Sequence, residues 1–123
     1  MTKIELFQHA KDFVTFKAGE RIFEAGQPGD YMYAVVEGEV DIVSRGKVLE
    51  TTGAGGIVGE LALIDRSPRS ASAFARSPCK LVPVDAKRFE YMVQQTPFFA
   101  LQVMRIMTER LRRWTEPPEA DRG

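Results

Sequence analysis

The residues best suited to chemistry lie in one glycine-rich stretch, residues 53–73, which reads GAGGIVGELALIDRSPRSASA. Its first seven residues hold four glycines, so the backbone can approach a ligand closely with its amides free. The residues after Gly59 favour a helix, which places Gly59 and Glu60 at the N-terminus of a short helical turn. Such a terminus offers unpaired N–H groups and a partial positive charge, and both favour an anion.

Two side chains that follow this turn fit the same anion. Arg69 can add a guanidinium fork and Ser70 a hydroxyl from the next expected strand. The stretch is not a Walker loop, because no Gly-Lys-Ser/Thr follows the glycines, and it lacks the βαβ context of a Rossmann fingerprint. From the residues alone, anion binding and a plain surface loop remain alternatives.

The rest of the chain offers few groups for catalysis. His9 is the one histidine and Cys79 the one cysteine, and they are far apart in the sequence. They fit two unrelated structural residues better than a nucleophile and its base. Zinc needs three or four nitrogen or sulfur ligands, so a zinc site and a metal-dependent cupin are both excluded. We therefore expect neither an enzyme nor a resident cofactor.

The length and the net charge of the chain narrow the classes of protein to which it can belong. The 123 residues suffice for one domain, and 17 basic residues balance 17 acidic ones. Without a positive field, direct nucleic-acid binding is not expected. No apolar run approaches the ~20 residues of a membrane span, and the first residues do not begin a signal peptide. We expect a cytoplasmic protein with no membrane insertion.

Short apolar runs between glycine-containing turns predict an all-β sandwich or barrel. Glu37-Gly38 and Arg45-Gly46 are expected as tight hairpin corners, because glycine adopts a positive φ without strain. The expected strands are residues 13–16, 21–23, 31–36, 40–44, 48–51, 70–75 and 80–84.

After these strands the pattern changes to a helical period. Asp85 can cap a helix over residues 85–95, and Thr96-Pro97 can separate it from a second helix over 97–114. A short leading helix is expected at residues 4–10, and residues 115–123 are expected to form a flexible tail.

The segment GELALIDRSPRSA resembles the phosphate-binding cassette of cyclic nucleotide-binding domains in catabolite-activator-type regulators, cyclic-nucleotide-dependent kinases and gated channels. That motif runs Gly-Glu-hydrophobic-Ala-Leu, a few variable residues, and then Arg-Ser/Ala/Thr-Ala. Residues 16–22, 24–33 and 36–40 also resemble the family's early strands. The resemblance covers about residues 6–114, so residues 1–114 are expected to form one such domain.

This resemblance implies a mainly β fold, an eight-stranded β-roll (jelly roll) over about residues 12–84 with flanking helices. It also implies one bound 3′,5′-cyclic nucleotide, cAMP or cGMP, with cAMP favoured on family base rates. Glu60 would accept the ribose 2′-OH, Arg69 would pair with the cyclic phosphate, and Ser70 and the amides of the turn from Glu60 would complete the cradle. An Arg69–Glu60 ion pair without ligand is the structural alternative. The expected ligand-binding residues are Gly59, Glu60, Leu61, Ala62, Arg69, Ser70, Ala71 and Arg110.

The last helix is expected to act as a lid with one broad apolar arc. Arg110 interrupts this arc, and it either extends its stem over the core edge towards water or reaches the purine. Trp114 either stacks on the base or caps the apolar packing. Five residues of this helix recur at the alternating spacing of four and three that is typical of a coiled coil: Ala100, Met104, Met107, Leu111 and Trp114. This pattern is too short for a stable coiled coil, so a monomer or a weak homodimer is expected.

These features predict a cyclic-nucleotide sensor whose last helix moves when the ligand binds. The alternatives are a ligand-free β-roll that docks on a partner protein, and a regulatory fragment of a larger channel, kinase or transcription factor. The start at Met1 and the acidic, proline-containing tail favour a stand-alone module.

Overall fold

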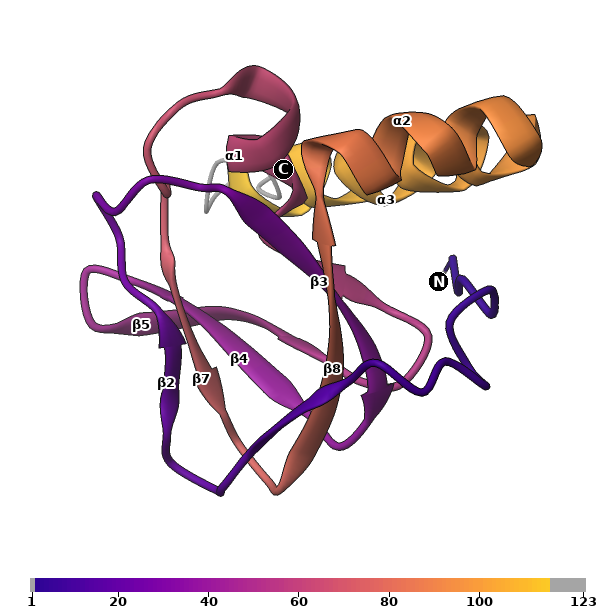
Figure 1. Cartoon of the computed structure of the whole chain (residues 1–123). Coiled ribbons are helices and arrows are strands. Elements are labelled where there is room, and N and C mark those ends of the chain that lie inside the picture. Colours follow the sequence, from indigo (N-terminus) through magenta and orange to yellow (C-terminus); the bar gives the residue numbers. More distant parts are fainter. Residues whose placement is uncertain (1, 116–123) are drawn as a thin grey trace.

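Eight short strands form two four-stranded antiparallel sheets, and helices gather at one end of them (Figure 1). The computed structural model describes residues 2–115. The strands are β1 (Val14–Phe16), β2 (Arg21–Phe23), β3 (Tyr31–Glu37), β4 (Val40–Ser44), β5 (Lys47–Thr52), β6 (Ile57–Val58), β7 (Ser72–Ala75) and β8 (Cys79–Asp85). The helices are α1 (Glu60–Asp65), α2 (Ala86–Gln95) and α3 (Pro97–Thr115). The eight-stranded β-roll with C-terminal helices is therefore confirmed.

One sheet has the order β1-β8-β3-β6 and the other β2-β7-β4-β5. Strand β6 lies inside the glycine-rich stretch, where no strand was expected, and pairs with Tyr33 and Ala34 of β3. Because β6 leads directly into α1, this pairing fixes the start of the helical turn to the sheet.

The two expected hairpin corners have different outcomes. Arg45 and Gly46 both have positive φ (53° and 78°) and join β4 to β5, as a two-residue hairpin turn requires. Gly38 instead carries the chain from one sheet to the other, because β3 and β4 do not pair. A Cβ on Gly38 would lie 2.2 Å from the carbonyl oxygen of Pro78, so the close approach requires glycine there. The prediction of a hairpin at Glu37-Gly38 was wrong.

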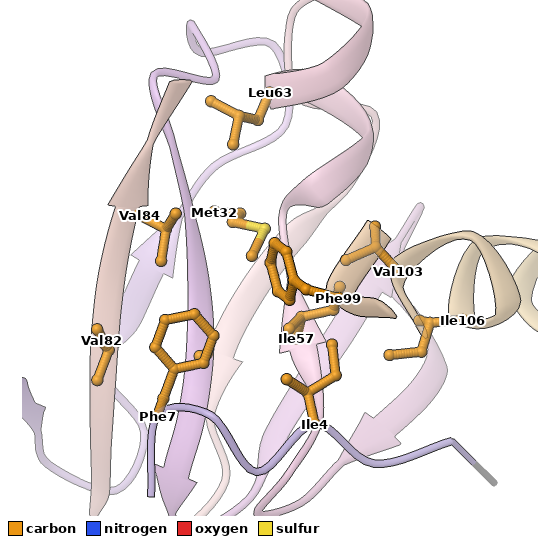
Figure 2. Packing of buried hydrophobic residues seen from close by; sticks show 11 residues of the cluster. Ile4, Phe7, Met32, Ile57, Leu63, Val82, Val84, Phe99, Val103 and Ile106 are labelled. Carbon is orange, nitrogen blue, oxygen red and sulfur yellow. The ribbon is translucent and has the colours of Figure 1, made fainter. Parts of the chain in front are cut away.

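The core has two parts. Figure 2 shows the part beneath the helices, where Phe99, Val103 and Ile106 of α3 pack on Met32 and Val84 of the first sheet. The other part lies between the sheets; its buried residues are Phe23, Val35, Val40, Ile42, Val58, Ala71, Ala73, Ala75, Cys79 and Leu81. Packing of α3 on the first part holds the helix beside the sheets.

The two C-terminal helices begin and end at clear signals. The side chain of Asp85 accepts a hydrogen bond from the backbone N–H of Arg88 at 2.8 Å and so caps α2. Thr96 has non-helical angles (φ −138°, ψ 80°) and separates α2 from α3. Helix α3 includes Thr115, and the rest of the expected tail lies outside the described residues. Among residues 2–115, no helix is long and apolar enough to span a membrane.

The expected leading helix at residues 4–10 is wrong. This segment forms isolated turns, with i to i+3 bonds from Gln8 N to Glu5 O and from Ala10 N to Phe7 O. Ile4 donates its backbone N–H to Gly55 O at 2.6 Å, and Ile4 and Phe7 are buried in the core. These tertiary contacts fix the segment in place, because so short a helix has little stability of its own.

Candidate functional site

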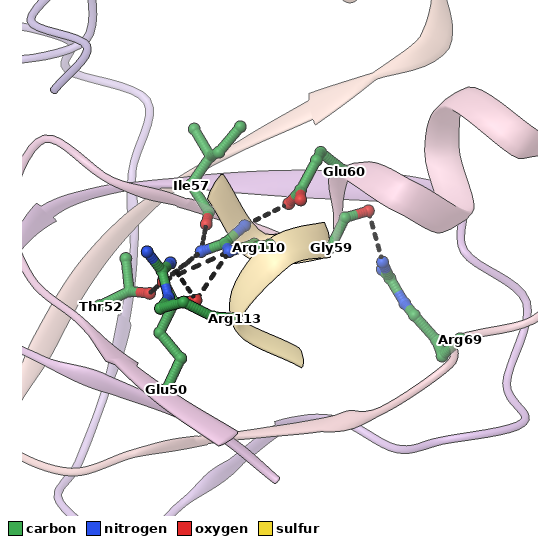
Figure 3. A network of polar contacts seen from close by, with 8 residues as sticks. All are labelled: Glu50, Thr52, Ile57, Gly59, Glu60, Arg69, Arg110 and Arg113. Carbon is green, nitrogen blue, oxygen red and sulfur yellow. Dashed lines mark hydrogen bonds and ion pairs between the residues drawn. The ribbon is translucent and has the colours of Figure 1, made fainter. Parts of the chain in front are cut away.

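A pocket lies between α1, strands β2 and β4 of the second sheet and the last turns of α3. It brings together all eight residues that the sequence predicted for ligand binding. Phe23 and Ile42, which were not expected to contact a ligand, also line the pocket. So does Trp114, which was expected either to stack on the base or to cap the apolar packing. Figure 3 shows the polar contacts of Glu60, Arg69 and Arg110, three of the residues that line this pocket.

Arg69 is a buried cation whose hydrogen bonds within residues 2–115 go to two backbone carbonyls. The residue is only 6% exposed, and its guanidinium carbon lies 3.9 Å from the centre of the Phe23 ring. Nη1 donates to the carbonyl of Gly59 at 3.1 Å and Nη2 to that of Tyr31 at 2.6 Å, while buried Nε has no partner. No carboxylate of residues 2–115 lies within ion-pair distance of it. Burial lowers the pKa of Arg69, which reflects the cost of keeping this charge out of water.

Gly59 makes the contact between α1 and Arg69 close. It caps α1 with a φ of 81°, a left-handed conformation that glycine adopts readily. A Cβ there would lie 2.5 Å from Nη1 of Arg69. The glycine therefore lets the guanidinium rest against the start of α1, where the first backbone N–H groups have no partner within the helix.

Arg110 forms the centre of a second, neutralised cluster. Its guanidinium donates to Glu60 Oε1 at 2.7 Å, to Glu50 Oε2 at 3.1 Å and to the hydroxyl of Thr52 at 3.0 Å. It also donates to the carbonyl of Ile57 at 2.6 Å. The side chain is 2% exposed, so the interpretation that it extends towards water was wrong. Burial opposes its charge, yet Glu60 and Glu50 outweigh that effect and raise the pKa of Arg110.

The cluster also decides the partner of Glu60. Glu60 pairs with Arg110 and not with Arg69, so the alternative of an Arg69–Glu60 ion pair was wrong. The two arginines thus differ: Arg110 is paired with carboxylates, whereas Arg69 forms no ion pair with a carboxylate of the described residues.

Sequence reasoning missed Glu50, which binds both Arg110 and Arg113. Burial raises the pKa of Glu50, but hydrogen bonds from the two arginines outweigh burial and lower it overall. The sequence does place Glu50 between an apolar and a β-branched residue in an expected strand. This pattern does not single out a buried carboxylate, because charged residues alternate with such neighbours on many strands that face water.

The pocket is nearly filled by the protein itself. Its cavity volume is about 30 Å³, well below the roughly 300 Å³ or more that pockets for small molecules enclose. Trp114, in the last turn of α3, contributes to this closure, and its buried indole Nε1 has no hydrogen-bond partner among residues 2–115. A molecule of nucleotide size enters only if part of this lining moves.

No group of three or more potential metal ligands occurs within residues 2–115. The fold and the pocket define a class: a β-roll with a buried, unneutralised arginine beside a short helix and a C-terminal helix over the opening. The family model described as "Cyclic nucleotide-binding domain" matches residues 13–96. The chain belongs to the cyclic nucleotide-binding domain family.

Two curated relatives are regulators. A "CRP-like cAMP-activated global transcriptional regulator" of Mycobacterium tuberculosis is 30% identical over 81% of this chain and 47% of the regulator. A "cAMP-dependent protein kinase regulatory subunit" of Yarrowia lipolytica is 39% identical over 58% of this chain and 19% of the subunit. This chain thus spans about half the length of the first relative and a fifth of the second.

Solved structures agree with this assignment. The catabolite activator protein of Thermus thermophilus is 28% identical with a TM-score of 0.71, over 81% of this chain and 50% of that chain. The EAL enzyme Bd1971 in its cGMP-bound form is 33% identical with a TM-score of 0.63, over 84% of this chain and 29% of that chain. Its cAMP-bound form is 32% identical with a TM-score of 0.62, over 81% and 28%.

Proposed function

We propose that this domain is a sensor that binds one 3′,5′-cyclic nucleotide, cAMP or cGMP, in the pocket beside α1. The observation that carries the proposal is Arg69, a buried guanidinium with no carboxylate partner among residues 2–115. A buried charge is costly unless it is paired, and a cyclic phosphate supplies one matching negative charge. Relatives named for cAMP activation and cAMP dependence support the same ligand class.

The other cassette residues then have complementary roles. Ser70 and the first amides of α1 donate to the phosphate oxygens that Arg69 does not reach. Glu60 accepts the ribose 2′-OH through Oε2, since Oε1 already accepts from Arg110. Arg110 holds the Glu60 carboxylate and removes the charge that would otherwise repel the phosphate.

Ligand binding is coupled to the last turns of α3. Arg110 and Trp114 both line the pocket from this helix, and the remaining free volume is about 30 Å³. Pockets for small molecules usually enclose about 300 Å³ or more, so nucleotide entry requires these turns to shift. The ligand can shift the equilibrium of α3 from the closed to the open position only by the difference between its binding free energies for the two positions. Regulation then follows from binding, with no catalytic step.

Calorimetric titration with cAMP, cGMP and linear 5′-AMP tests the proposal. Saturable binding of a cyclic nucleotide, at least tenfold tighter than that of 5′-AMP, is the expected result. The linear nucleotide carries a second phosphate charge, which one buried arginine cannot neutralise. Absence of binding by both cyclic nucleotides would favour the β-roll as an interaction module, for which the exposed Met104 and Leu111 of α3 offer apolar surface.

A further inference from the structure

A second cavity, larger than the pocket around Arg69, lies beside α1. We call it the α1 groove; it lies between residues 26–30 in the loop before β3, residues 62–68, and Ala86 at the start of α2. Its volume is about 460 Å³, within the range of about 300–1,000 Å³ that is usual for small-molecule sites. Among residues 2–115, only Ala62 lines both cavities, so the groove and the pocket are separate sites.

Backbone contacts hold the two sides of the α1 groove together. Gly26 N donates to Arg69 O at 2.9 Å, and Arg69 N donates to Gln27 O at 2.8 Å. Gly29 lies so close to α1 that a Cβ there would be 2.2 Å from Cβ of Ala62. The loop before β3 is thus fixed against α1 and against the segment that follows it, so the groove is a preformed part of the fold.

Arg66 brings a guanidinium to this groove from a backbone conformation that suits glycine. It ends α1 with φ 55° and ψ 36°, in the left-handed region. Residues with a Cβ are strained there, so helices commonly end on glycine at such a position. Among residues 2–115, Arg45 is the other residue besides glycine with a positive φ, and the hairpin turn explains it. No such turn explains Arg66, and a strained residue at a cavity points to a function for its side chain.

The two charged residues of the α1 groove are not paired. Arg66 and Asp30 are both exposed, and neither forms an ion pair within residues 2–115. The rest of the lining is mostly apolar and includes Pro28, Leu63 and Pro68. A guanidinium and a carboxylate beside an apolar surface complement a molecule with a carboxylate, an ammonium and an apolar body.

We propose that the α1 groove binds a short free peptide with apolar side chains, its terminal carboxylate at Arg66 and its terminal ammonium at Asp30. This inference goes beyond the proposed function, because the site is separate from the nucleotide pocket. The charged ends of an extended dipeptide are roughly 7 Å apart, since each residue spans about 3.3–3.6 Å. A dipeptide can therefore reach two side chains that do not meet each other, whereas a single amino acid carries both charges on one carbon.

A titration followed by the backbone amide NMR signals tests the inference. The probes are leucyl-leucine, its C-terminal amide, which lacks the carboxylate, and its N-acetyl derivative, which lacks the ammonium. Saturable shifts are expected at the amides of Gly26, Gly29, Ser67 and Ala86, which line the groove. Each blocked peptide is expected to bind about 2-fold to 5-fold more weakly than leucyl-leucine, the range of an ion pair that faces water.

Two variants assign each end of the peptide to its partner. Arg66→Asn removes the guanidinium, and asparagine tolerates the left-handed conformation. This variant is expected to bind leucyl-leucine about 2-fold to 5-fold more weakly and the amide unchanged, since the amide has no carboxylate to lose. Asp30→Asn is expected to weaken leucyl-leucine alike and to leave the N-acetyl peptide unchanged. Arg45→Asn is the matched control, because Arg45 also has a positive φ but does not line the groove, and it should keep all three affinities.

The Arg69→Ala variant separates this inference from the proposed function. Leucyl-leucine should bind this variant as tightly as wild type, because the Arg69 side chain lines the other cavity. Absence of leucyl-leucine binding, or equal binding of all three peptides, overturns the inference and leaves the proposed function standing. Binding of leucyl-leucine as expected, with no binding of either cyclic nucleotide, supports the inference and overturns the proposed function alone.

Discussion

Nη1 of Arg110 lies 2.7 Å from Oε1 of Glu60, and both side chains are only 2% exposed. This ion pair joins α3 to the first residue of α1, fifty positions earlier. Glu50 and Thr52 extend the pair into β5, so three elements meet at one guanidinium (Figure 3). Any movement of α3 away from the pocket must therefore change the environment of a proposed ligand-binding carboxylate.

Arg110→Met is expected to destabilise the ligand-free domain by about 3–5 kcal/mol, because it leaves the Glu60 carboxylate buried and unpaired. Urea denaturation at pH 7 measures this loss. Arg112→Met, on the exposed face of the same helix, is the control and should change stability little. Adding Glu60→Gln to Arg110→Met should restore part of the stability, since the unpaired charge is then removed. A loss below about 1 kcal/mol, the range of surface ion pairs, would contradict the buried pair.

Glu50 predicts a specific dependence of stability on pH. Its folded pKa is lowered because hydrogen bonds from Arg110 and Arg113 outweigh burial, so its contribution is present above the unfolded pKa of about 4.3. That contribution is lost as the pH falls through the lower folded value. Wild type should be more stable than Glu50→Gln at pH 7, and this difference should shrink below about pH 4.3.

The control for this pH series is Glu90→Gln, at an exposed position of α2. Its difference from wild type should stay near zero throughout the same range. A difference between wild type and Glu50→Gln that is constant from pH 7 to pH 3 would show that the Glu50 charge does not stabilise the fold.

The sequence predicted the pocket well where its residues are close along the chain. Gly59, Glu60, Arg69 and Ser70 fall within twelve positions, and the structure carries them on the start of α1 and on the loop before β7, although the expected strand began at Ser70. The glycine signals likewise predicted the turn at Arg45-Gly46, because two successive positive φ angles select a hairpin.

What the sequence did not predict depends on contacts between distant segments. Arg110 and Glu50 are sixty positions apart, and a helical arc shows only that Arg110 points inwards, not which carboxylate meets it. Gly38 signals a turn, but its φ does not decide whether the next strand pairs with the last one or enters the other sheet. The two-residue strand β6 is too short to show a period of two.

Arg69→Ala is expected to weaken cyclic-nucleotide binding by about 2–4 kcal/mol, or roughly 30-fold to 1,000-fold, because the phosphate loses a charge-assisted partner. Calorimetric titration measures the loss, and Arg76→Ala provides an exposed control in the turn after β7. Arg69→Ala also removes a buried charge that has no carboxylate partner among residues 2–115. The free energy of unfolding of the ligand-free domain should therefore fall by less than the free energy of nucleotide binding. A folded Arg69→Ala variant with unchanged affinity would refute the assignment of the cassette.

Glu60→Gln separates the ribose contact from the ion pair. An amide oxygen still accepts from the 2′-OH, so this change should weaken nucleotide binding less than Arg69→Ala does. A 2′-deoxy cyclic nucleotide should bind wild type more weakly than the natural ligand and lose little more with Glu60→Ala. Full additivity of the ligand change and the residue change would mean that Glu60 does not touch the ribose.

Hydrogen exchange with and without saturating ligand tests which part of the fold responds. Protection should change most in residues 59–71 and in the last turns of α3, because Arg110 and Trp114 close a pocket with about 30 Å³ of free volume. Amides near Val35 and Val40, which lie in the core between the sheets and do not line the pocket, should keep their protection and provide the internal control. Arg110→Met should reduce the difference between the free and bound states in α3, since the ion pair to Glu60 no longer joins the two segments. If α3 exchanges identically in both states while residues 59–71 respond, the pocket binds its ligand without transmitting a signal to the helix.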